Sequence, residues 1–95
     1  MATTVGLLHL RLHVAQAMSL KDKRRVLKSF RDRLSHGGNV SVAEVEAQDH
    51  RRMAVLAVAM VGSDTRYVQG ALQRIVNAAG THRDMILVDH ELEFL

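Results

Sequence analysis

Hydrophobic and polar residues alternate along residues 5–14, VGLLHLRLHV, from Gly6 onward. Alternation with a period of two residues is typical of a β-strand covered on one face. One face of this strand is entirely apolar and comprises Leu8, Leu10, Leu12 and Val14. The opposite face carries Leu7, His9, Arg11 and His13. We therefore expect a first strand whose apolar face packs against the core.

A helical period follows in residues 19–34, SLKDKRRVLKSFRDRL. The residues expected to face the core are Leu20, Val26, Leu27, Phe30 and Leu34. Ser19 is a favourable N-cap, because its hydroxyl can accept a hydrogen bond from an N–H of the first turn. We expect Gly37 or Gly38 to end the helix in the left-handed conformation.

The pattern then predicts a strand over residues 39–47, NVSVAEVEA, and a strand over 53–61, MAVLAVAMV, which is apolar on both faces like a central strand. Ser63 and Asp64 are candidate N-caps for a second helix over 65–79, which Gly80 closes. Its expected core face is Val68, Ala71, Leu72, Ile75 and Ala79. A last strand over 85–94 is expected to turn Ile86, Val88, His90, Leu92 and Phe94 inward. Its other face would carry Leu87, Asp89, Glu91 and Glu93.

The element order is strand, helix, strand, strand, helix, strand. Two right-handed split crossovers then give a four-stranded antiparallel sheet in the order 4-1-3-2, with both helices on one face. We therefore predict an α+β protein with the ferredoxin-like βαββαβ sandwich. Because 95 residues hold one core, we expect a single domain over 1–95.

The first and last strands are neighbours in this topology. His9, Arg11 and His13 would then share the helix-free face of the sheet with Asp89, Glu91 and Glu93. Opposite charges across two strands stabilise their register, so this is a structural interpretation of these residues. The third strand places Val, Ala or Met on the same face in either register, and an exposed apolar surface of this kind is often buried against another protein surface. We expect a homodimer formed through this open face.

Positive charge is concentrated in the first helix. Residues 19–34 hold seven basic and two acidic residues, a local net charge of +5, whereas the whole chain carries +3. Five of the cations are expected on one flank of the helix: Lys21, Arg24, Arg25, Lys28 and Arg31. Such a flank can be an ordinary solvated helix face, or it can contact consecutive phosphates of a nucleic acid. With only Phe30, Tyr67 and Phe94 as aromatic residues, the sheet offers no platform for stacking bases.

Lys23 falls on the apolar face of the helix, between Leu20, Leu27 and Phe30. Its side chain can extend past the sheet edge into solvent. Alternatively it pairs with Glu44 or Glu46 of the second strand, because an unpaired buried ammonium would be too costly. If Lys23 and Glu44 line a pocket, a small-ligand or enzymatic role follows.

The sequence contains no cysteine, phosphate-binding loop, nucleophile elbow or metalloprotease motif. The imidazoles of His9 and His13 would lie ~13 Å apart on one strand and cannot ligate one ion together. We expect no catalytic residue, no metal and no cofactor. With no signal peptide and no apolar run of about 18 residues, we expect a cytoplasmic protein that does not enter a membrane.

Two sequence blocks resemble a known family. Residues 19–25, SLKDKRR, and 39–45, NVSVAEV, with Gln48 and Asp49, are similar to the YlxP-like family of small bacterial proteins of unknown function. The resemblance implies a ferredoxin-like fold and a gene setting among transcription and translation factors, near a ribosome-binding factor. It implies no activity, so the matching positions remain candidates without a role: Lys21, Lys23, Arg24, Arg25 and Glu44.

These observations support two hypotheses. The first is a non-enzymatic accessory protein of translation or ribosome maturation, whose basic helix binds phosphates of rRNA or of a ribosomal subunit. The alternative is a dimeric protein-interaction module whose basic helix docks an acidic protein partner.

Overall fold

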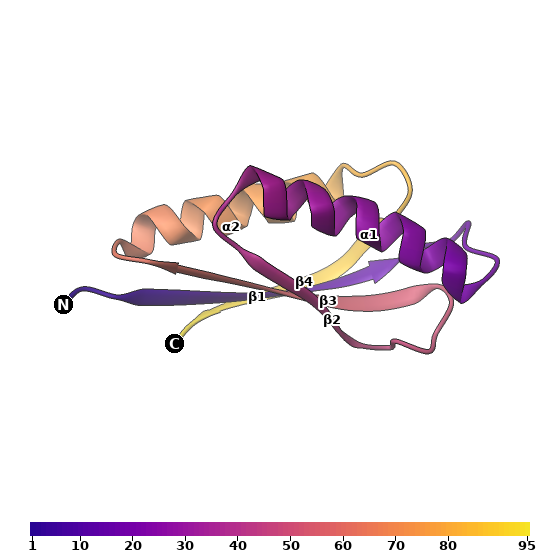
Figure 1. The fold of residues 1–95 in the computed structure, drawn as a ribbon, viewed down its shortest axis with the longest axis horizontal. Helices are drawn as coiled ribbons and strands as arrows, with labels where there is room; N and C mark the ends of the chain where they lie inside the picture. The colour runs from indigo at the N-terminus through magenta and orange to yellow at the C-terminus, as the bar shows by residue number, and fades with distance from the viewer.

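The six predicted elements are present in the computed structural model, which describes all of residues 1–95. They are β1 (Thr4–His13), α1 (Leu20–Gly37), β2 (Ser41–Glu46), β3 (Met53–Gly62), α2 (Thr65–Gly80) and β4 (Ile86–Phe94). The strands form one antiparallel sheet in the order β2-β3-β1-β4, which is the predicted order read from the other edge. Both helices cover one face of the sheet (Figure 1). The ferredoxin-like fold is confirmed.

The core lies between the helices and the helix-facing side of the sheet. β1 contributes Leu8, Leu10 and Leu12, and β3 contributes Ala54, Leu56 and Val58, all fully buried. The helices add Leu27, Phe30, Val68, Leu72, Val76 and Ala79. Val76 was not among the predicted core residues of α2, whereas the predicted Ala71 and Ile75 are only half-buried. Neither helix is long and apolar enough to cross a membrane.

Both helices begin at N-cap residues that the sequence predicts. Ser19 caps α1 by accepting a hydrogen bond from the Asp22 N–H, and Asp64 caps α2 by accepting one from the Arg66 N–H. The end of α1 differs from the prediction, because the helix continues to Gly37 and Gly38 is extended with φ −170°. No glycine has a positive φ, so the predicted left-handed cap was wrong.

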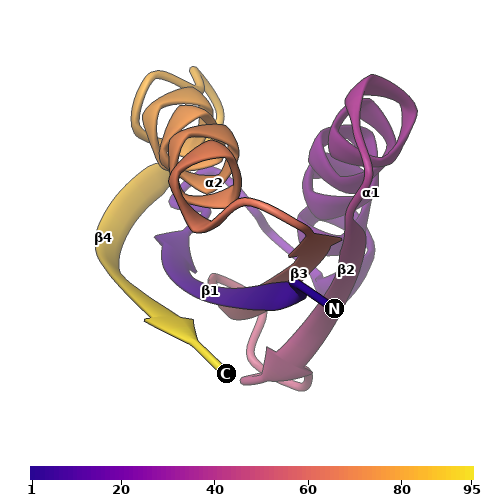
Figure 2. The same cartoon turned by 90° about the vertical axis from the view of Figure 1, so that its left-hand side faces the viewer.

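The two helices rest on different parts of the sheet. α2 packs on β1, β3 and β4, while α1 lies over β2. Gly6 in β1 permits the close approach of α2, because a Cβ there would lie 2.6 Å from Leu72 Cδ1 and 2.8 Å from Val68 Cγ1. The two helices lie apart from each other above the sheet (Figure 2).

A bulge in β4 changes the predicted side-chain directions at its start. Arg11 pairs with Asp89 but Leu12 pairs with Leu87, so Val88 is the extra residue. Leu87 therefore packs against the core, while Ile86 lies opposite His13 with 58% of its surface exposed. The expectation that Ile86 faces inward and Leu87 outward was wrong, because a single inserted residue reverses the alternation.

Candidate functional site

The predicted cationic flank of α1 is present at the surface. We call it the basic flank: Lys21, Arg24, Arg25, Lys28 and Arg31. Lys21 and Arg24 are exposed and make no ion pair or side-chain hydrogen bond with the rest of the chain. These two cations are free to meet an external anion.

Two other cations of the basic flank pair with carboxylates of the same helix. Arg25 Nη2 lies 2.6 Å from Asp22 Oδ1, and Lys28 Nζ lies 2.8 Å from Asp32 Oδ2. The Lys28 hydrogen bond is the main cause that lowers the pKa of Asp32, with smaller contributions from the charges of Lys28, His36 and Arg31. Both cationic side chains remain about three-quarters exposed, at 74% and 76%. Exposed pairs of this kind contribute little to stability, so an incoming phosphate can displace the carboxylates.

Arg31 connects the basic flank to the edge of the sheet. Its Nη2 donates a long hydrogen bond of 3.4 Å to the carbonyl of Val42 in β2, an edge strand. Arg24, Lys28 and Arg31 line a surface groove of about 410 Å³ between α1 and β2, together with Leu27, Asp32, Ser35, Val42 and Glu44. Arg33 lies apart, with its guanidinium 5.9 Å from the centroid of the Phe30 ring.

Lys23 is fully buried and pairs with Glu44. Its Nζ donates hydrogen bonds of 2.9 Å to Glu44 Oε2, 2.9 Å to the Ala47 carbonyl and 3.0 Å to the Met53 carbonyl. The Gln48 carbonyl lies 3.4 Å from the same nitrogen. Of the two arrangements open from the sequence, the structure therefore has the paired one, and Glu46 is not the partner because it is exposed on the other face.

This buried ammonium holds the loop between β2 and β3. The three carbonyls that it contacts belong to the loop and its edge, and Ala47 there has a φ of 59°, a conformation that L-residues seldom adopt. Since the Lys23 side chain has no exposed surface, it is closed to an external ligand. A small-ligand or enzymatic role centred on Lys23 and Glu44 thus lacks an accessible amine.

The open face of the sheet carries a charged half beside β4. Arg11 Nη1 lies 4.0 Å from Asp89 Oδ2, and His9 lies opposite Glu91. Glu93 lies opposite Leu7, and the bulge places Ile86 rather than an acid opposite His13. The expected ion pair across the two strands is therefore found for Arg11; His9 faces Glu91 without an ion pair, and His13 has no acid opposite it.

The other half of the open face is apolar. We call it the open-face patch: Val5, Leu7, Ala57, Ala59 and Val61. These residues pair across β1 and β3, Val5 with Val61 and Leu7 with Ala59. Four are half-buried by their neighbours, whereas Val61 is 55% exposed.

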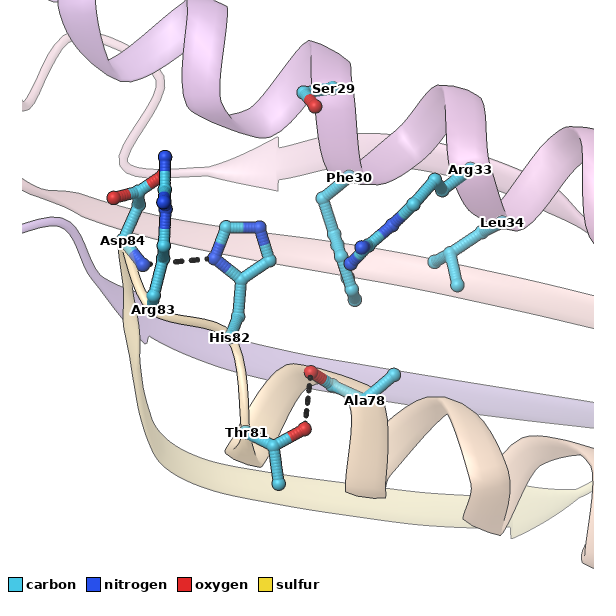
Figure 3. Close-up of a pocket in the computed structure, with 9 residues that line it drawn as sticks. All are labelled: Ser29, Phe30, Arg33, Leu34, Ala78, Thr81, His82, Arg83 and Asp84. Atoms are coloured by element: carbon cyan, nitrogen blue, oxygen red, sulfur yellow. Dashed lines mark hydrogen bonds and ion pairs between the residues drawn. The ribbon is translucent and has the colours of Figure 1, made fainter.

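The sequence analysis missed a cluster of side chains just beyond the C-terminal end of α2, where His82 meets α1. The His82 ring meets the Phe30 ring edge-on with 5.7 Å between centroids, and His82 Nδ1 accepts the Asp84 N–H at 3.0 Å (Figure 3). Burial is the main cause that lowers the pKa of His82, and the nearby charge of Arg33 adds to it. The one sequence feature that pointed to this cluster was Arg33, because its angle around the helix separates it from the basic flank. No three His, Asp or Glu side chains converge as a metal site would require.

Comparison with known proteins shows the family. A model described as "Protein of unknown function (DUF503)" matches residues 5–92. The uncharacterized protein YlxP of Bacillus subtilis is 35% identical over 63 residues, which cover 66% of this chain and 68% of YlxP. The chain belongs to the DUF503 family. The resemblance seen in the two sequence blocks is thereby confirmed.

Similarity to solved structures bears on the fold of this DUF503 chain and says nothing about its activity. The de novo designed protein Foldit4 is 14% identical and aligns with a TM-score of 0.57 over 98% of this chain and 96% of its own. SnoaB of Streptomyces nogalater, a cofactor-independent oxygenase, is 11% identical with a TM-score of 0.48 over 100% of this chain and 92% of its own. The first similarity supports the fold alone, and the second is too weak to support any inference.

Proposed function

We propose that this protein is a non-enzymatic accessory factor of translation or ribosome maturation that binds RNA phosphates through the basic flank of α1. The observation that carries the proposal is the exposed row of cations on one side of the helix. Lys21 and Arg24 have no partner in the chain, and Arg25 and Lys28 are about three-quarters exposed beside their partners Asp22 and Asp32.

The length of the row suits a phosphate backbone. Lys21 and Arg31 are ten residues apart, which corresponds to about 15 Å along a helix axis. Phosphates of one strand lie only a few ångströms apart along a duplex axis, roughly 3.4 Å in B-DNA, so the row would run beside several of them. Rows of this kind give affinity that depends on salt and little on sequence.

The aromatic residues support phosphate contacts rather than base stacking. Phe30 is fully buried, and Tyr67 lies on α2. Phe94 pairs with Gly6 on the helix-facing side of the sheet and is 38% exposed, less inward than predicted. Because no aromatic ring lies on the open face, we expect recognition of a structured RNA by its backbone, as in rRNA or a ribosomal subunit.

A salt titration with a structured RNA hairpin tests the proposal. We expect the logarithm of the binding constant to fall linearly with the logarithm of salt concentration. Replacing Arg24 and Lys28 together by Gln should lower the magnitude of the slope by about 1.5, from about 0.7–0.9 per lost phosphate contact. Arg51→Gln with Arg66→Gln removes two exposed cations outside α1 as the matched control and should leave the slope unchanged. No binding at low salt, or equal slopes in both double variants, would reject the proposal.

A second function is favoured by the open-face patch, five apolar residues that include Val61 with 55% of its surface exposed. In this alternative the chain is a homodimer formed through the open face, and the basic flank docks an acidic protein. A pull-down from lysate with and without nuclease separates the two functions. Partners lost on nuclease treatment support RNA binding, whereas partners that persist support the protein-interaction module.

A further inference from the structure

A long groove separates the two helices on the side of the sheet that they cover. One end is a cavity of about 710 Å³ beside His82, drawn in Figure 3, and the other is a cavity of about 600 Å³ beside Tyr67. Arg33, Leu34 and Ala78 line both cavities. The two hollows therefore adjoin, and we call them together the interhelical groove.

The floor and one wall of the interhelical groove are apolar. Leu34, Val40 and Met60 belong to its lining, and α2 adds a stripe at helical spacing: Tyr67, Ala71, Ile75 and Ala78. This stripe is separate from the face of α2 that is buried on the sheet. Because two of its four members are alanines, Ala71 and Ala78, the space between the helices is not filled by side chains of the protein.

Two guanidinium groups without an ion pair line the groove. Arg33 enters the lining from α1 and Arg74 from α2, and neither makes an ion pair. Of the two carboxylates at the ends of the groove, Asp64 caps α2 by accepting the Arg66 N–H and makes no ion pair, and Asp84 Oδ2 lies 3.6 Å from Arg83 Nε, so Arg33 and Arg74 outnumber the one unpaired carboxylate. A guanidinium recognises carboxylate and phosphate groups through two parallel hydrogen bonds.

We propose that the interhelical groove binds a small amphipathic anion, a molecule with one carboxylate or phosphate group on an apolar body. The anionic group would lie between Arg33 and Arg74, and the apolar body along Leu34, Ile75 and Ala78. Each cavity has a volume within the range of roughly 300–1,000 Å³ that is usual for small-molecule sites. This site uses none of the cations of the basic flank and is independent of RNA binding.

Titration of the ¹⁵N-labelled protein with octanoate, octyl phosphate and neutral octanamide tests the proposal. Octanoate or octyl phosphate should shift the amides of residues that line the groove, such as Leu34, Ala78 and His82, and should bind at least about tenfold more tightly than octanamide. The tighter of the two anions identifies the carboxylate or the phosphate as the preferred head group. No binding of either anion, or equal binding of octanamide, overturns the proposal.

Variants locate the site. Arg33→Gln and Arg74→Gln should each weaken binding of the preferred anion by about tenfold, since each removes a charged hydrogen-bond donor. Arg66→Gln is the control, because Arg66 lies on the same helix as Arg74 and does not line the groove. Ala78→Leu should block binding by filling the junction of the two cavities, with the amide spectrum confirming the fold. Unchanged affinity in both arginine variants would overturn the assignment.

Discussion

At the scale of single residues, the buried ammonium of Lys23 is the most demanding feature of the molecule. A charge removed from water is tolerated only where hydrogen bonds and an opposite charge replace the solvent. Glu44 supplies the charge, and the carbonyls of Ala47 and Met53 complete the set of three short hydrogen bonds. Lys23 thus connects the first turn of α1 to the loop that joins β2 and β3.

Removing this amine should destabilise the fold. Lys23→Met leaves Glu44 and two carbonyls without their donor, and we expect a loss of about 3–5 kcal/mol in the free energy of unfolding. Lys21→Met, in the same turn but exposed, should change it by less than about 0.5 kcal/mol. Urea denaturation measures both values. If the double variant Lys23→Met with Glu44→Leu recovers part of the loss, the unpaired carboxylate of Glu44 is its cause. If Lys23→Met is as stable as the wild type, the buried ammonium does not stabilise the fold.

His82 should make stability depend on pH. Because burial and the charge of Arg33 lower its pKa below the ordinary value of 6.5, the unfolded chain binds this proton more readily than the folded one. The contribution to stability is therefore complete above about pH 6.5 and is lost as the pH falls from there toward the folded-state pKa. NMR titration of the His82 ring gives that pKa directly. Arg33→Gln should raise it, and a pKa at or above 6.5 in the wild type would contradict the prediction.

At the scale of elements, sequence periodicity predicted which residues of a single helix or strand face the core. It placed Leu8, Leu10 and Leu12 in the core and Lys23 on the inward face of α1. It could not choose between Glu44 and Glu46 as the partner of Lys23, because β2 carries a bulge between them that only its pairing with β3 reveals. The interhelical groove was missed for a similar reason, since it depends on how far apart two helices lie.

The spacing between α2 and the sheet should depend on Gly6. Gly6→Ala introduces a Cβ within 2.6 Å of Leu72 Cδ1, so the helix must shift or the side chains must leave their rotamers. Overpacking of this kind costs about 1–3 kcal/mol. Gly37→Ala is the matched control, because a Cβ added at Gly37 would have no other atom within 4 Å. Thermal denaturation should show a lower midpoint for the first variant only, and equal midpoints would contradict the close approach.

At the scale of the whole molecule, the candidate surfaces lie on different sides. The basic flank and the interhelical groove belong to the helical layer, whereas the open-face patch belongs to the opposite side of the sheet (Figure 2). Two copies joined through their open faces would leave both basic flanks exposed and directed outward. A dimer and RNA binding are therefore compatible, and a long RNA could contact both flanks with a gain in avidity.

Dimerisation through the open face has a direct test. In light scattering at micromolar concentration we expect a mass of twice 10.6 kDa for the wild type. Val61→Lys places a charge on the apolar surface that such a dimer would bury and should yield monomers, because an unpaired charge in a buried apolar interface is costly. Met18→Lys is the control, since Met18 is an exposed apolar residue in the loop before α1 and lies outside the sheet. A monomeric wild type, or a dimer that survives Val61→Lys, would show that the open-face patch does not join two copies.

If Val61→Lys also weakens binding to a long RNA but not to a short hairpin, the loss is one of avidity, and the basic flank of each copy still binds by itself.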